Sequence, residues 1–544
     1  MLEFASKADR NALIEKLNKK LFSTANVPYR LKPYAKIVEN PRETIFFDRE
    51  LSNKLNNDSA VLGTDANLLR DKSDKPLLVS LASKLLQIVI AKMANFIPGG
   101  GIWLNTQRPE WNDANNALAG YGLSIVTLCY VHRFLCFIID LFASSSENKF
   151  AVPAEVADCF IELADLYKAV DAAVAASNPS ERKQFIDKAG KIFEEERNAL
   201  YAAAFQNGVK KLSKTAITEG LSAIKKHAEI TIRCNKRADG LFHSYNTMSI
   251  SESSVEISNL QIMLEGQVAV LSSKLITPEE AGNVAKALAA SQLYEKRQNA
   301  YLLYPNKELP KFTVKNNIEE SELKDLQDLI KRSGSIFFKD SNGKYHFNGN
   351  YRNISVLRQE ISALPENQKP SKEETVEIER IYEKTFNHQN FTGRSGTFFA
   401  YEGLGSIYWH MIAKLLLSVQ ENISISSDES RQQLVDAYYT IRSGIGFNKE
   451  PALYGAFPAD PYSHTPENQG AKQPGMTGQV KEEILTRFGE LGIDIDDGKA
   501  CFHPSFLKKE EFDADGSLEF YWCGTKVVYE NASEPKIAVC LNDG

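Results

Sequence analysis

Residues 99–143 read GGGIWLNTQRPEWNDANNALAGYGLSIVTLCYVHRFLCFIIDLFA, a polar and aromatic loop followed by an apolar run. The run 123–143 approaches a membrane span in length, but it carries His132, Arg133 and Asp140. Charged side chains inside a membrane span are costly and rare. The stretch therefore predicts a long loop that leads into a helix buried in protein.

The composition is that of a soluble globular protein with more than one core. The chain has 544 residues, 43% hydrophobic and 25% charged, with a net charge of −6. This length predicts two or more domains, and the acidic balance argues against a nucleic-acid or anionic-membrane surface. The 7 Cys residues contain no Cys-x-x-Cys pair, which favours free thiols in a reducing compartment. The charged first residues are not typical of a secretory signal, so we expect a cytoplasmic protein.

The sequence pattern changes twice along the chain. Residues 1–75 are mixed and polar, residues 76–490 are mainly helical, and residues 491–544 contain short alternating strands. Because the chain stops on a hairpin-turn signal, we expect the C-terminal β-domain to be cut short. Two capping boxes are predicted, at Thr277 with Glu280 and at Ser371 with Glu374. Helices are predicted at 155–176, 180–206, 210–234, 254–272, 403–420 and 427–443.

Long loops rich in Gly, Pro, Tyr and Asn separate the helices of residues 76–490. Loops longer than about 15 residues are usually functional or disordered, and these loops carry too many aromatic residues for disorder. Helices that alternate with functional loops over this length suit a ring of helical hairpins. We therefore predict a mainly α fold, an (α/α)6-type toroid (six-hairpin glycosidase-like) that forms the catalytic domain at 76–490, with a small C-terminal β-domain.

The loop 99–122 places Arg108, Glu110 and Asp113 around Trp111. An indole can stack on the apolar face of a sugar ring, and neighbouring Arg and Asn side chains can bind its hydroxyl groups. A carboxyl group beside an indole can have its pKa raised and then act as a general acid at neutral pH. The alternative is that Asp113 caps a helix that begins near Ala114. The two roles are compatible.

A second cluster, RSGTFFAYEGLGSIYWH, contains Arg394, Tyr401, Glu402, Tyr408 and His410. A glycine-spaced loop that enters a helix offers backbone N–H groups and the positive end of the helix dipole to an anion. The alternative is that Glu402 charges the first turn of the helix and His410 is a satisfied core histidine.

A third cluster ends at Thr477 and Gly478, which precede a predicted helix and are flanked by Lys472 and Lys481. A hydroxyl group and backbone N–H groups at a helix start can seat a phosphate. Asp460 lies in the same segment, where its alternative role is to organise the loop.

In a fourth segment, MLEGQVAVLSS, the polar residues Glu265 and Gln267 interrupt an apolar helix. Polar groups on a buried face need partners, which neighbouring loops or a ligand could supply. Two carboxylates, a stacking aromatic ring and polar loops together indicate a carbohydrate ligand.

The order of these segments resembles the inverting glycoside phosphorylases of the cellobiose phosphorylase type, including relatives that act on β-glucans. RPEWNDANN is similar to the family's Asp-Trp-Asn-Asp-Gly motif and puts Asp113 at its general acid. LEGQVAVLSS is similar to the family's Leu-Asn-x-Gln-x-Trp-Ala-Val-x-Ser helix and puts Gln267 at the Gln. GAKQPGMTGQ is similar to the Gly-rich stretch that ends in Tyr-Thr-Gly-Ser, with Thr477 and Gly478 on the phosphate-binding pair. The resemblance covers about residues 95–544.

The resemblance implies a set of site residues. The family's Glu-Asn-Gly-Gly…His segment corresponds to RSGTFFAYE, where Arg394 replaces the Glu and Tyr401 replaces the phosphate-binding His. The family also has a large N-terminal β-sandwich, so we expect this chain to be the C-terminal part of a longer protein. The catalytic residue would be Asp113, the substrate-binding residues Arg108, Glu110, Trp111, Gln267, Glu402 and Asp460, and the phosphate-binding residues Arg394, Tyr401, Thr477 and Gly478.

The implied reaction is inverting phosphorolysis of β-linked gluco-oligosaccharides to a sugar 1-phosphate. Inorganic phosphate would be the co-substrate, with no cofactor, metal, nucleic acid or membrane involved, and the resemblance allows a homodimer. One alternative is an inverting hydrolase or transglycosidase, which needs a second carboxylate about 6.5–9.5 Å from the acid; Glu402 and Asp460 are candidates. The others are a lyase that uses Tyr408 and His410, and a non-catalytic glycan-binding protein.

Overall fold

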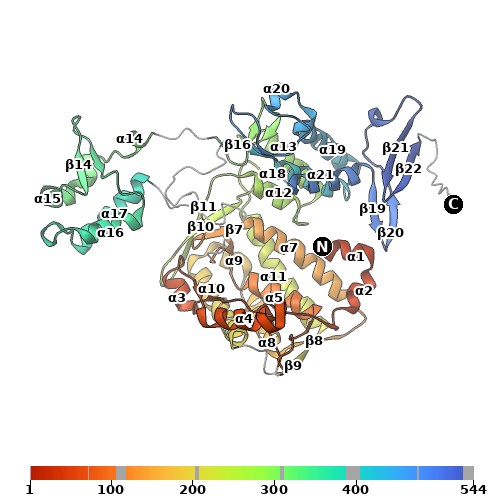
Figure 1. Cartoon of the computed structure of the whole chain (residues 1–544), viewed down its shortest axis with the longest axis horizontal. Coiled ribbons are helices and arrows are strands. Elements are labelled where there is room, and N and C mark those ends of the chain that lie inside the picture. The colour runs from red at the N-terminus through yellow and green to blue at the C-terminus, as the bar shows by residue number, and fades with distance from the viewer. Residues whose placement is uncertain are drawn as a thin grey trace.

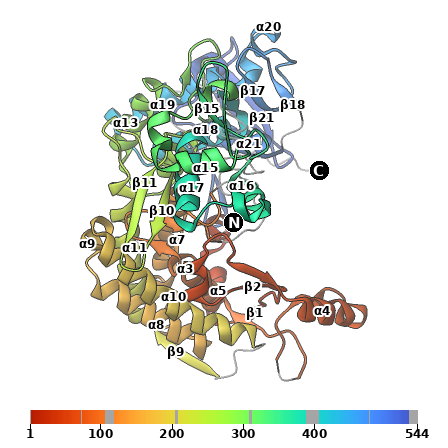
Figure 2. The ribbon, with the colours of Figure 1, turned by 90° about the vertical axis from the view of Figure 1, so that its left-hand side faces the viewer.

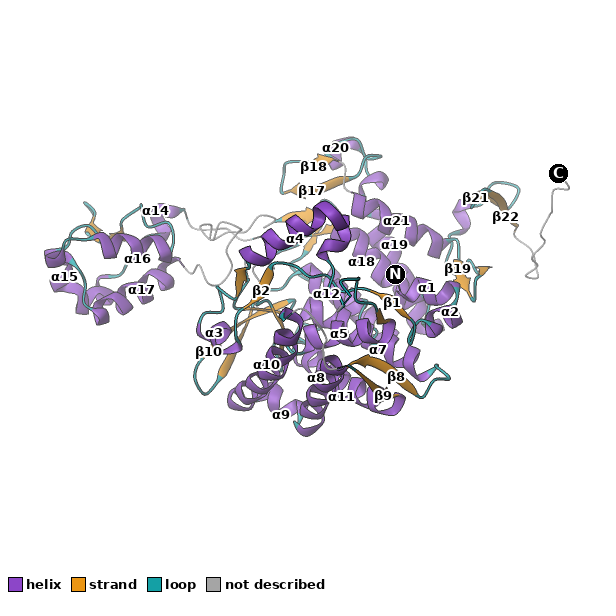
Figure 3. Cartoon of the chain, turned by 60° about the horizontal axis from the view of Figure 1, so that its bottom comes forward, coloured by secondary structure: helices purple, strands orange, loops and turns teal. Residues whose placement is uncertain are grey.

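The computed structural model describes residues 2–71, 73–105, 118–202, 208–306, 311–386, 405–474 and 477–530. Within these ranges helices form most of the body and the strands are short (Figures 1 and 3). The main helices are α5 (Leu81–Met93), α7 (Ile125–Ala143), α8 (Ala154–Ala169), α10 (Pro179–Tyr201), α11 (Lys214–Cys234), α12 (Leu264–Leu271), α13 (Pro278–Ala289), α18 (Trp409–Ile423), α19 (Asp428–Ser443) and α21 (Thr477–Glu490). The helices predicted at 180–206, 210–234 and 427–443 correspond to α10, α11 and α19.

The order of the helices explains why the loops gather on one face. α7, α12, α18 and α21 each begin after a long loop, and they pack side by side in that order. Contacts further along the helices keep the same order: Arg133 Nη1 of α7 donates to Ser272 O just after α12, Asn422 Nδ2 of α18 donates to Leu271 O of α12, and Gln420 Nε2 of α18 donates to Thr486 O of α21. The four helices therefore run in the same direction, and their starts lie together.

α7 is the helix that the apolar run 123–143 predicted. Its length and composition would allow it to cross a membrane, but 56% of its most apolar window is buried inside the protein. Its charged side chains have protein partners: Arg133 pairs with Glu3 at 2.7 Å and with Glu421 at 2.8 Å, and Asp140 pairs with Arg10 at 2.6 Å. Because charge and apolar surface are both matched within the chain, α7 is a core helix of this body.

The prediction of a mainly α, (α/α)6-type toroid is wrong. The described residues contain a five-stranded antiparallel sheet inside the helical body, and a three-stranded antiparallel sheet lies before α21. The first has the order β11 (Val255–Asn259), β10 (Tyr245–Ile250), β7 (Gly122–Ser124), β6 (Gly101–Trp103) and β5 (Phe96–Ile97), and the second the order β16 (Ser406–Tyr408), β17 (Tyr462–Pro466) and β18 (Lys472–Pro474). The fold is therefore helical hairpins joined by strand-containing loops.

Strand length is the physical reason for this error. Strands of two or three residues, such as β5, β6, β7 and β16, are too short to show the alternation that identifies a strand in a sequence. In the range 254–272, predicted as one helix, the structure has strand β11 and then the short helix α12. In the range 403–420, strand β16 precedes α18.

Residues 311–386 form a unit with its own hydrophobic core, which lies apart from the main body in Figure 1. Leu323, Phe347 and Tyr382 are fully buried in this core. The predicted capping box is present here, since Ser371 N donates to Glu374 and Glu374 N donates to Ser371 Oγ. The elements are α14 (Phe312–Lys315), α15 (Gln327–Arg332), β14 (Phe337–Lys339), β15 (Tyr345–Phe347), α16 (Ile354–Ala363) and α17 (Lys372–Phe386).

The first and last described segments pack on the same end of the body. Lys7 in α1 (Leu2–Ala8) pairs with Asp494 in β19 (Ile493–Asp496) at 2.7 Å. Beyond β19 the described residues form two antiparallel hairpins, β19 with β20 (Lys499–Phe502) and β21 (Ser517–Trp522) with β22 (Thr525–Glu530). Near the start of the chain, α4 (Arg49–Leu62) projects from the body (Figure 2). The boundaries at residues 75 and 490 stay predictions.

Candidate active site

A continuous series of hydrogen bonds joins the starts of α7, α12 and α18. Ile125 N, the first of α7, donates to Ser244 O at 3.0 Å, and Gly266 N in the first turn of α12 donates to Ser244 Oγ at 2.9 Å. Leu264 N donates to Leu303 O at 3.0 Å, and Leu303 N donates to Ser406 O at 2.9 Å. Loops that are far apart in the sequence therefore meet at these helix starts.

The series continues to α21 through the three-stranded sheet. Tyr408 pairs with His464, and His464 pairs in turn with Lys472. β18 ends at Pro474, shortly before α21 begins at Thr477. The described ends of the four segments singled out in the sequence thus converge at one place, which we call the loop face: the starts of α7, α12, α18 and α21 with the described residues just before them.

The glycine turn at Gly99–Gly101 connects β5 to β6 and leaves no room for side chains. A Cβ atom at Gly99 would lie 2.4 Å from the carbonyl oxygen of Ala176, and one at Gly100 would lie 2.3 Å from Cδ1 of Leu123. Gly99 and Gly101 also have φ values of +77° and +118°, which side chains disfavour. Glycine is required here because the backbone passes directly over its neighbours.

The described residues on either side of 106–117 are held together by hydrogen bonds. Trp103 Nε1 donates to Gly120 O at 3.0 Å, Gly120 N donates to Leu104 O at 2.7 Å, and Leu104 N donates to Gly122 O at 2.9 Å. The described residues on the two sides of 106–117 are therefore fixed to each other on the loop face. The predicted residues Arg108, Glu110, Trp111 and Asp113 lie outside the described residues.

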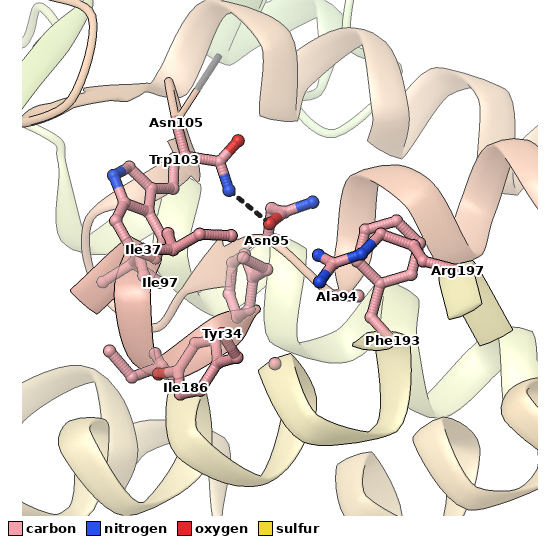
Figure 4. A pocket seen from close by; sticks show the side chains of 12 residues that line it. Tyr34, Ile37, Ala94, Asn95, Ile97, Trp103, Asn105, Ile186, Phe193 and Arg197 are labelled. Carbon is pink, nitrogen blue, oxygen red and sulfur yellow. Dashed lines mark hydrogen bonds between the residues drawn. The ribbon is translucent and has the colours of Figure 1, made fainter. Parts of the chain in front are cut away.

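Figure 4 shows the packing behind this place. Asn105 Nδ2 donates to Asn95 Oδ1 at 2.6 Å, and both residues line a cavity of about 10 Å³ together with Trp103 and Arg197. That volume suits about one water molecule, so the cavity is not a substrate site. The residues around it pack against the end of β6.

The two polar residues of α12 have different surroundings. Gln267 is 0% exposed, accepts from Phe242 N at 2.9 Å and donates to Phe242 O at 2.8 Å and to Met263 O at 3.0 Å. Its amide thus holds neighbouring backbone, as the alternative without a ligand proposed, and its role as a sugar contact stays a prediction. Glu265, half-buried in the first turn, accepts from Tyr245 Oη at 2.8 Å.

α18 begins with an aromatic residue fixed on both sides. Trp409 is 1% exposed and its Nε1 donates to Thr465 Oγ1 at 2.9 Å. Nζ of Lys449 lies 4.7 Å from the centre of its ring and donates to Gln298 Oε1 at 3.1 Å. Burial lowers the pKa of Lys449 to about 8. The first residue of α18 is therefore rigidly placed, which fixes the direction of the next side chain, His410.

His410 lies against the second turn of α21. Its Nε2 atom is 3.5 Å from Oε2 of Glu482, too long for a good hydrogen bond. Both atoms are buried without a hydrogen-bond partner among the described residues, as is Oε1 of Gln479. His410 therefore faces Glu482 in a long ion-pair contact, and the alternative that it is a core histidine stays open.

The charge of Glu482 follows from its surroundings. Burial would raise the pKa of this carboxyl group, but the neighbouring His410 and Lys481 outweigh burial and lower it. Glu482 is thus ionised at neutral pH. The next residue, Glu483, has its pKa raised by burial. Sequence reasoning missed both carboxylates; their position one turn after Thr477-Gly478 was the available signal.

Thr477 and Gly478 are the first two residues of α21, so the predicted helix start is confirmed. Their backbone N–H groups belong to the positive end of the helix dipole. Asp460 is exposed and lies just before β17. The other predicted residues of this region, Arg394, Tyr401 and Glu402, lie outside the described residues.

A cavity of about 110 Å³ opens beside β16 and β17. Polar residues, among them Arg297, Gln298 and Asn468, line it together with Leu302 and Ile407. Ligand pockets typically measure about 300–1,000 Å³, so this cavity does not contain a whole substrate site. Across the described ranges, no group of three or more His, Cys, Asp and Glu side chains is arranged to hold a metal ion.

One comparison with known proteins identifies part of the chain. Residues 309–389 match the family model described as GH149 phosphorylase insertion domain 2. The match coincides with the unit that has its own hydrophobic core, and it supports a glycoside phosphorylase family and an enzyme that acts on glycosides. No curated protein matches the chain.

Proposed function

We propose that this protein is an inverting phosphorylase that cleaves β-linked gluco-oligosaccharides and releases a sugar 1-phosphate. The convergence of the described ends of four loop segments at the starts of four neighbouring helices carries the proposal. The match of residues 309–389 to a domain of a phosphorylase supports the reaction class. The sequence motifs alone support two finer parts of the proposal: that the site is of the cellobiose phosphorylase type, and that the substrate is glucosyl.

Phosphate would bind where α18 and α21 begin. The N–H groups of Thr477 and Gly478 belong to a helix start, which favours an anion. Nε2 of His410 faces Glu482, so its Nδ1 atom is the nitrogen that remains for a ligand. We therefore propose His410 as the histidine that binds phosphate, instead of Tyr401, with Arg394 as a further ligand.

The reaction needs one protein carboxyl group. An oxygen of phosphate attacks the anomeric carbon from the face opposite the leaving group, the glycosidic C–O bond breaks, and Asp113 transfers its proton to the departing oxygen. The products are an α-configured sugar 1-phosphate and an oligosaccharide shorter by one unit. Because phosphate itself is the nucleophile, no second carboxylate is required as the base that an inverting hydrolase needs.

The test is incubation of the protein with β-linked gluco-oligosaccharides, with and without inorganic phosphate. We expect glucose 1-phosphate to form only when phosphate is present. Free glucose released at the same rate without phosphate would show a hydrolase instead, and an unsaturated product that absorbs ultraviolet light would show a lyase. Binding without any product would identify a non-catalytic glycan-binding protein.

A further inference from the structure

Four ionisable side chains meet where α7 packs against α11. Cys136 and His132 are one turn apart on α7, and Glu229 and Lys225 are one turn apart on α11. The sulfur atom of Cys136 lies 3.9 Å from Nδ1 and 4.0 Å from Nε2 of His132. The proposed function uses none of these four side chains.

The surroundings of His132 favour its charged form. Nδ1 lies 2.8 Å from the carbonyl oxygen of Ser273, and Nε2 lies 3.2 Å from Oε1 of Glu229. A carbonyl group and an ionised carboxylate can only accept hydrogen bonds, so the ring satisfies both when each nitrogen carries a hydrogen. The ring is 1% exposed, which leaves little room for water to replace either partner. His132 is therefore held as an imidazolium.

The charges of the cluster are balanced only if Cys136 is ionised. Oε1 of Glu229, which faces the imidazolium ring, also lies 2.6 Å from Nζ of Lys225, so one carboxylate faces two cations. The other charged side chains of α7, Arg133 and Asp140, have ion-pair partners of their own. One positive charge therefore remains beside the sulfur atom, and a thiolate at Cys136 would balance it.

Cys136 also differs from other cysteines of the chain in access and ionisation. Burial would raise the pKa of its thiol, but His132 and Lys225 outweigh burial and lower it. Its side chain is half-buried, whereas Cys129 is buried. Cys234 is more exposed, but partial burial raises the pKa of its thiol. Since the thiolate is the nucleophile and the thiol is not, Cys136 combines ionisation with contact to solvent.

We propose that Cys136 is a reactive thiolate site that small hydroperoxides oxidise to a sulfenic acid. The sulfur attacks one oxygen of hydrogen peroxide, an S–O bond forms and the O–O bond breaks. Sulfur gives up two electrons, and the departing hydroxide takes a proton from solvent to become water. Accessible cysteines with thiolate character are the ones that follow this chemistry. The proposal does not depend on the proposed function.

The first test compares two cysteines within the wild-type protein. Folded protein is treated with iodoacetamide between pH 6.5 and pH 8.5, and peptide mass mapping measures the modification of Cys136 and Cys234. Below its pKa a thiol loses about 10-fold in thiolate for each pH unit, so the labelling rate of Cys234 should fall about 100-fold over this range. The rate of Cys136 should fall less than about 10-fold and exceed that of Cys234 about 10-fold at pH 6.5. A parallel fall of the two rates would overturn the proposal.

Substitutions test whether the cluster causes this reactivity. His132→Gln removes the charged ring and should lower the labelling rate of Cys136 at pH 6.5 about 10-fold, and Lys225→Met should lower it about 2- to 5-fold. Lys226→Met, which alters the exposed neighbour on α11, is the matched control and should keep the wild-type rate. Lys225 is 30% exposed, so Lys225→Met provides the test if His132→Gln does not fold. Unchanged rates in the folded variants would contradict the proposal.

A second measurement tests the oxidation step. The protein is treated with hydrogen peroxide in the presence of dimedone, which traps sulfenic acids, and the adducts are identified by mass spectrometry. We expect the adduct on Cys136, and less of it in Lys225→Met than in Lys226→Met. Cys234 and Cys523 are exposed and serve as internal controls for access. If they form the adduct before Cys136 does, exposure decides the reaction and the proposal is wrong; alkylation of Cys136 without any adduct would overturn the peroxide step.

Discussion

The two halves of the loop face differ in how their buried polar groups are paired. Before α7, the carbonyl groups of Pro98, Gly99 and Gly100 each accept from a buried side chain, and Ser124 caps the helix. At α18 and α21, atoms of His410, Gln479 and Glu482 are buried with no hydrogen-bond partner in the described part of the chain.

This difference distinguishes a turn that holds neighbouring backbone in place from a region that can bind a ligand. Buried polar atoms are nearly always paired in folded proteins. The carbonyl groups of the glycine turn before α7 are paired with buried side chains, so this turn holds backbone in place. The region at α18 and α21 leaves acceptor oxygens of Gln479 and Glu482 unpaired among the described residues, so a hydrogen-bond donor from a ligand or a neighbouring segment would complete it.

The largest effect is expected from the proposed proton donor. Asp113→Asn removes the proposed proton donor and should lower kcat on an oligosaccharide by about 10²–10⁴-fold, because proton transfer typically contributes that much. Initial-rate measurements of glucose 1-phosphate release provide the value. Asp140→Asn, which alters an exposed carboxylate on α7, is the control and should keep the wild-type rate. Full activity of Asp113→Asn would remove the assignment.

A change at His410, where α18 begins, should alter the binding of phosphate. His410→Ala removes a hydrogen bond to an anion, worth about 1.5–3 kcal/mol, and should raise KM for phosphate about 10- to 100-fold. His346→Ala, in the separate unit 311–386, should leave this KM unchanged. An unaltered KM for His410→Ala, with only a lower melting temperature, would mean that His410 and Glu482 are structural.

Much of the helical framework could be predicted from the sequence, because 3.6-residue periodicity and capping boxes are local signals. Thr277 and Glu280 form the expected capping box, and α10, α11 and α19 lie where periodicity predicted them. The short strands could not be predicted, since a two-residue strand such as β5 is defined by its partner and not by its own pattern.

The candidate site shows the same limit. The position of Thr477 and Gly478 at a helix start was predicted from local sequence. The opposition of His410 and Glu482 was not, because it joins two helices that are distant in the sequence. Gln267 was predicted as a sugar contact from a motif, whereas its amide binds the backbone of Phe242; only the three-dimensional structure supplies that partner.

A smaller effect should follow from crowding at the glycine turn. Gly100→Ala places a Cβ atom 2.3 Å from Cδ1 of Leu123, and such overpacking typically costs about 1–3 kcal/mol. Gly334→Ala is the control, because its Cβ would meet nothing within 4 Å. Denaturant unfolding measures both. If Gly100→Ala is as stable as Gly334→Ala, the glycine turn is not tightly packed against Leu123.

The smallest effect concerns His132 of α7, a histidine that contrasts with His410 because both of its ring nitrogens are engaged. Nδ1 lies 2.8 Å from Ser273 O and Nε2 lies 3.2 Å from Glu229 Oε1. Since both neighbours are acceptors, the ring needs two protons to satisfy them. Burial would lower the pKa of His132, but hydrogen bonds with Cys136, Ser273 and Glu229 outweigh burial and raise it.

A raised pKa in the folded state fixes the sign of the pH dependence. The stabilisation is fully present below the unfolded pKa of 6.5 and is lost as pH rises through the folded pKa, by up to about 1.4 kcal/mol for each unit between the two values. His132→Gln should therefore flatten the fall in unfolding free energy between pH 6 and pH 8.5, measured in urea. His227→Gln should not flatten this fall, because burial lowers the pKa of His227. Equal destabilisation by His132→Gln at both pH values would mean that His132 is neutral, and that Glu229 pairs only with Lys225.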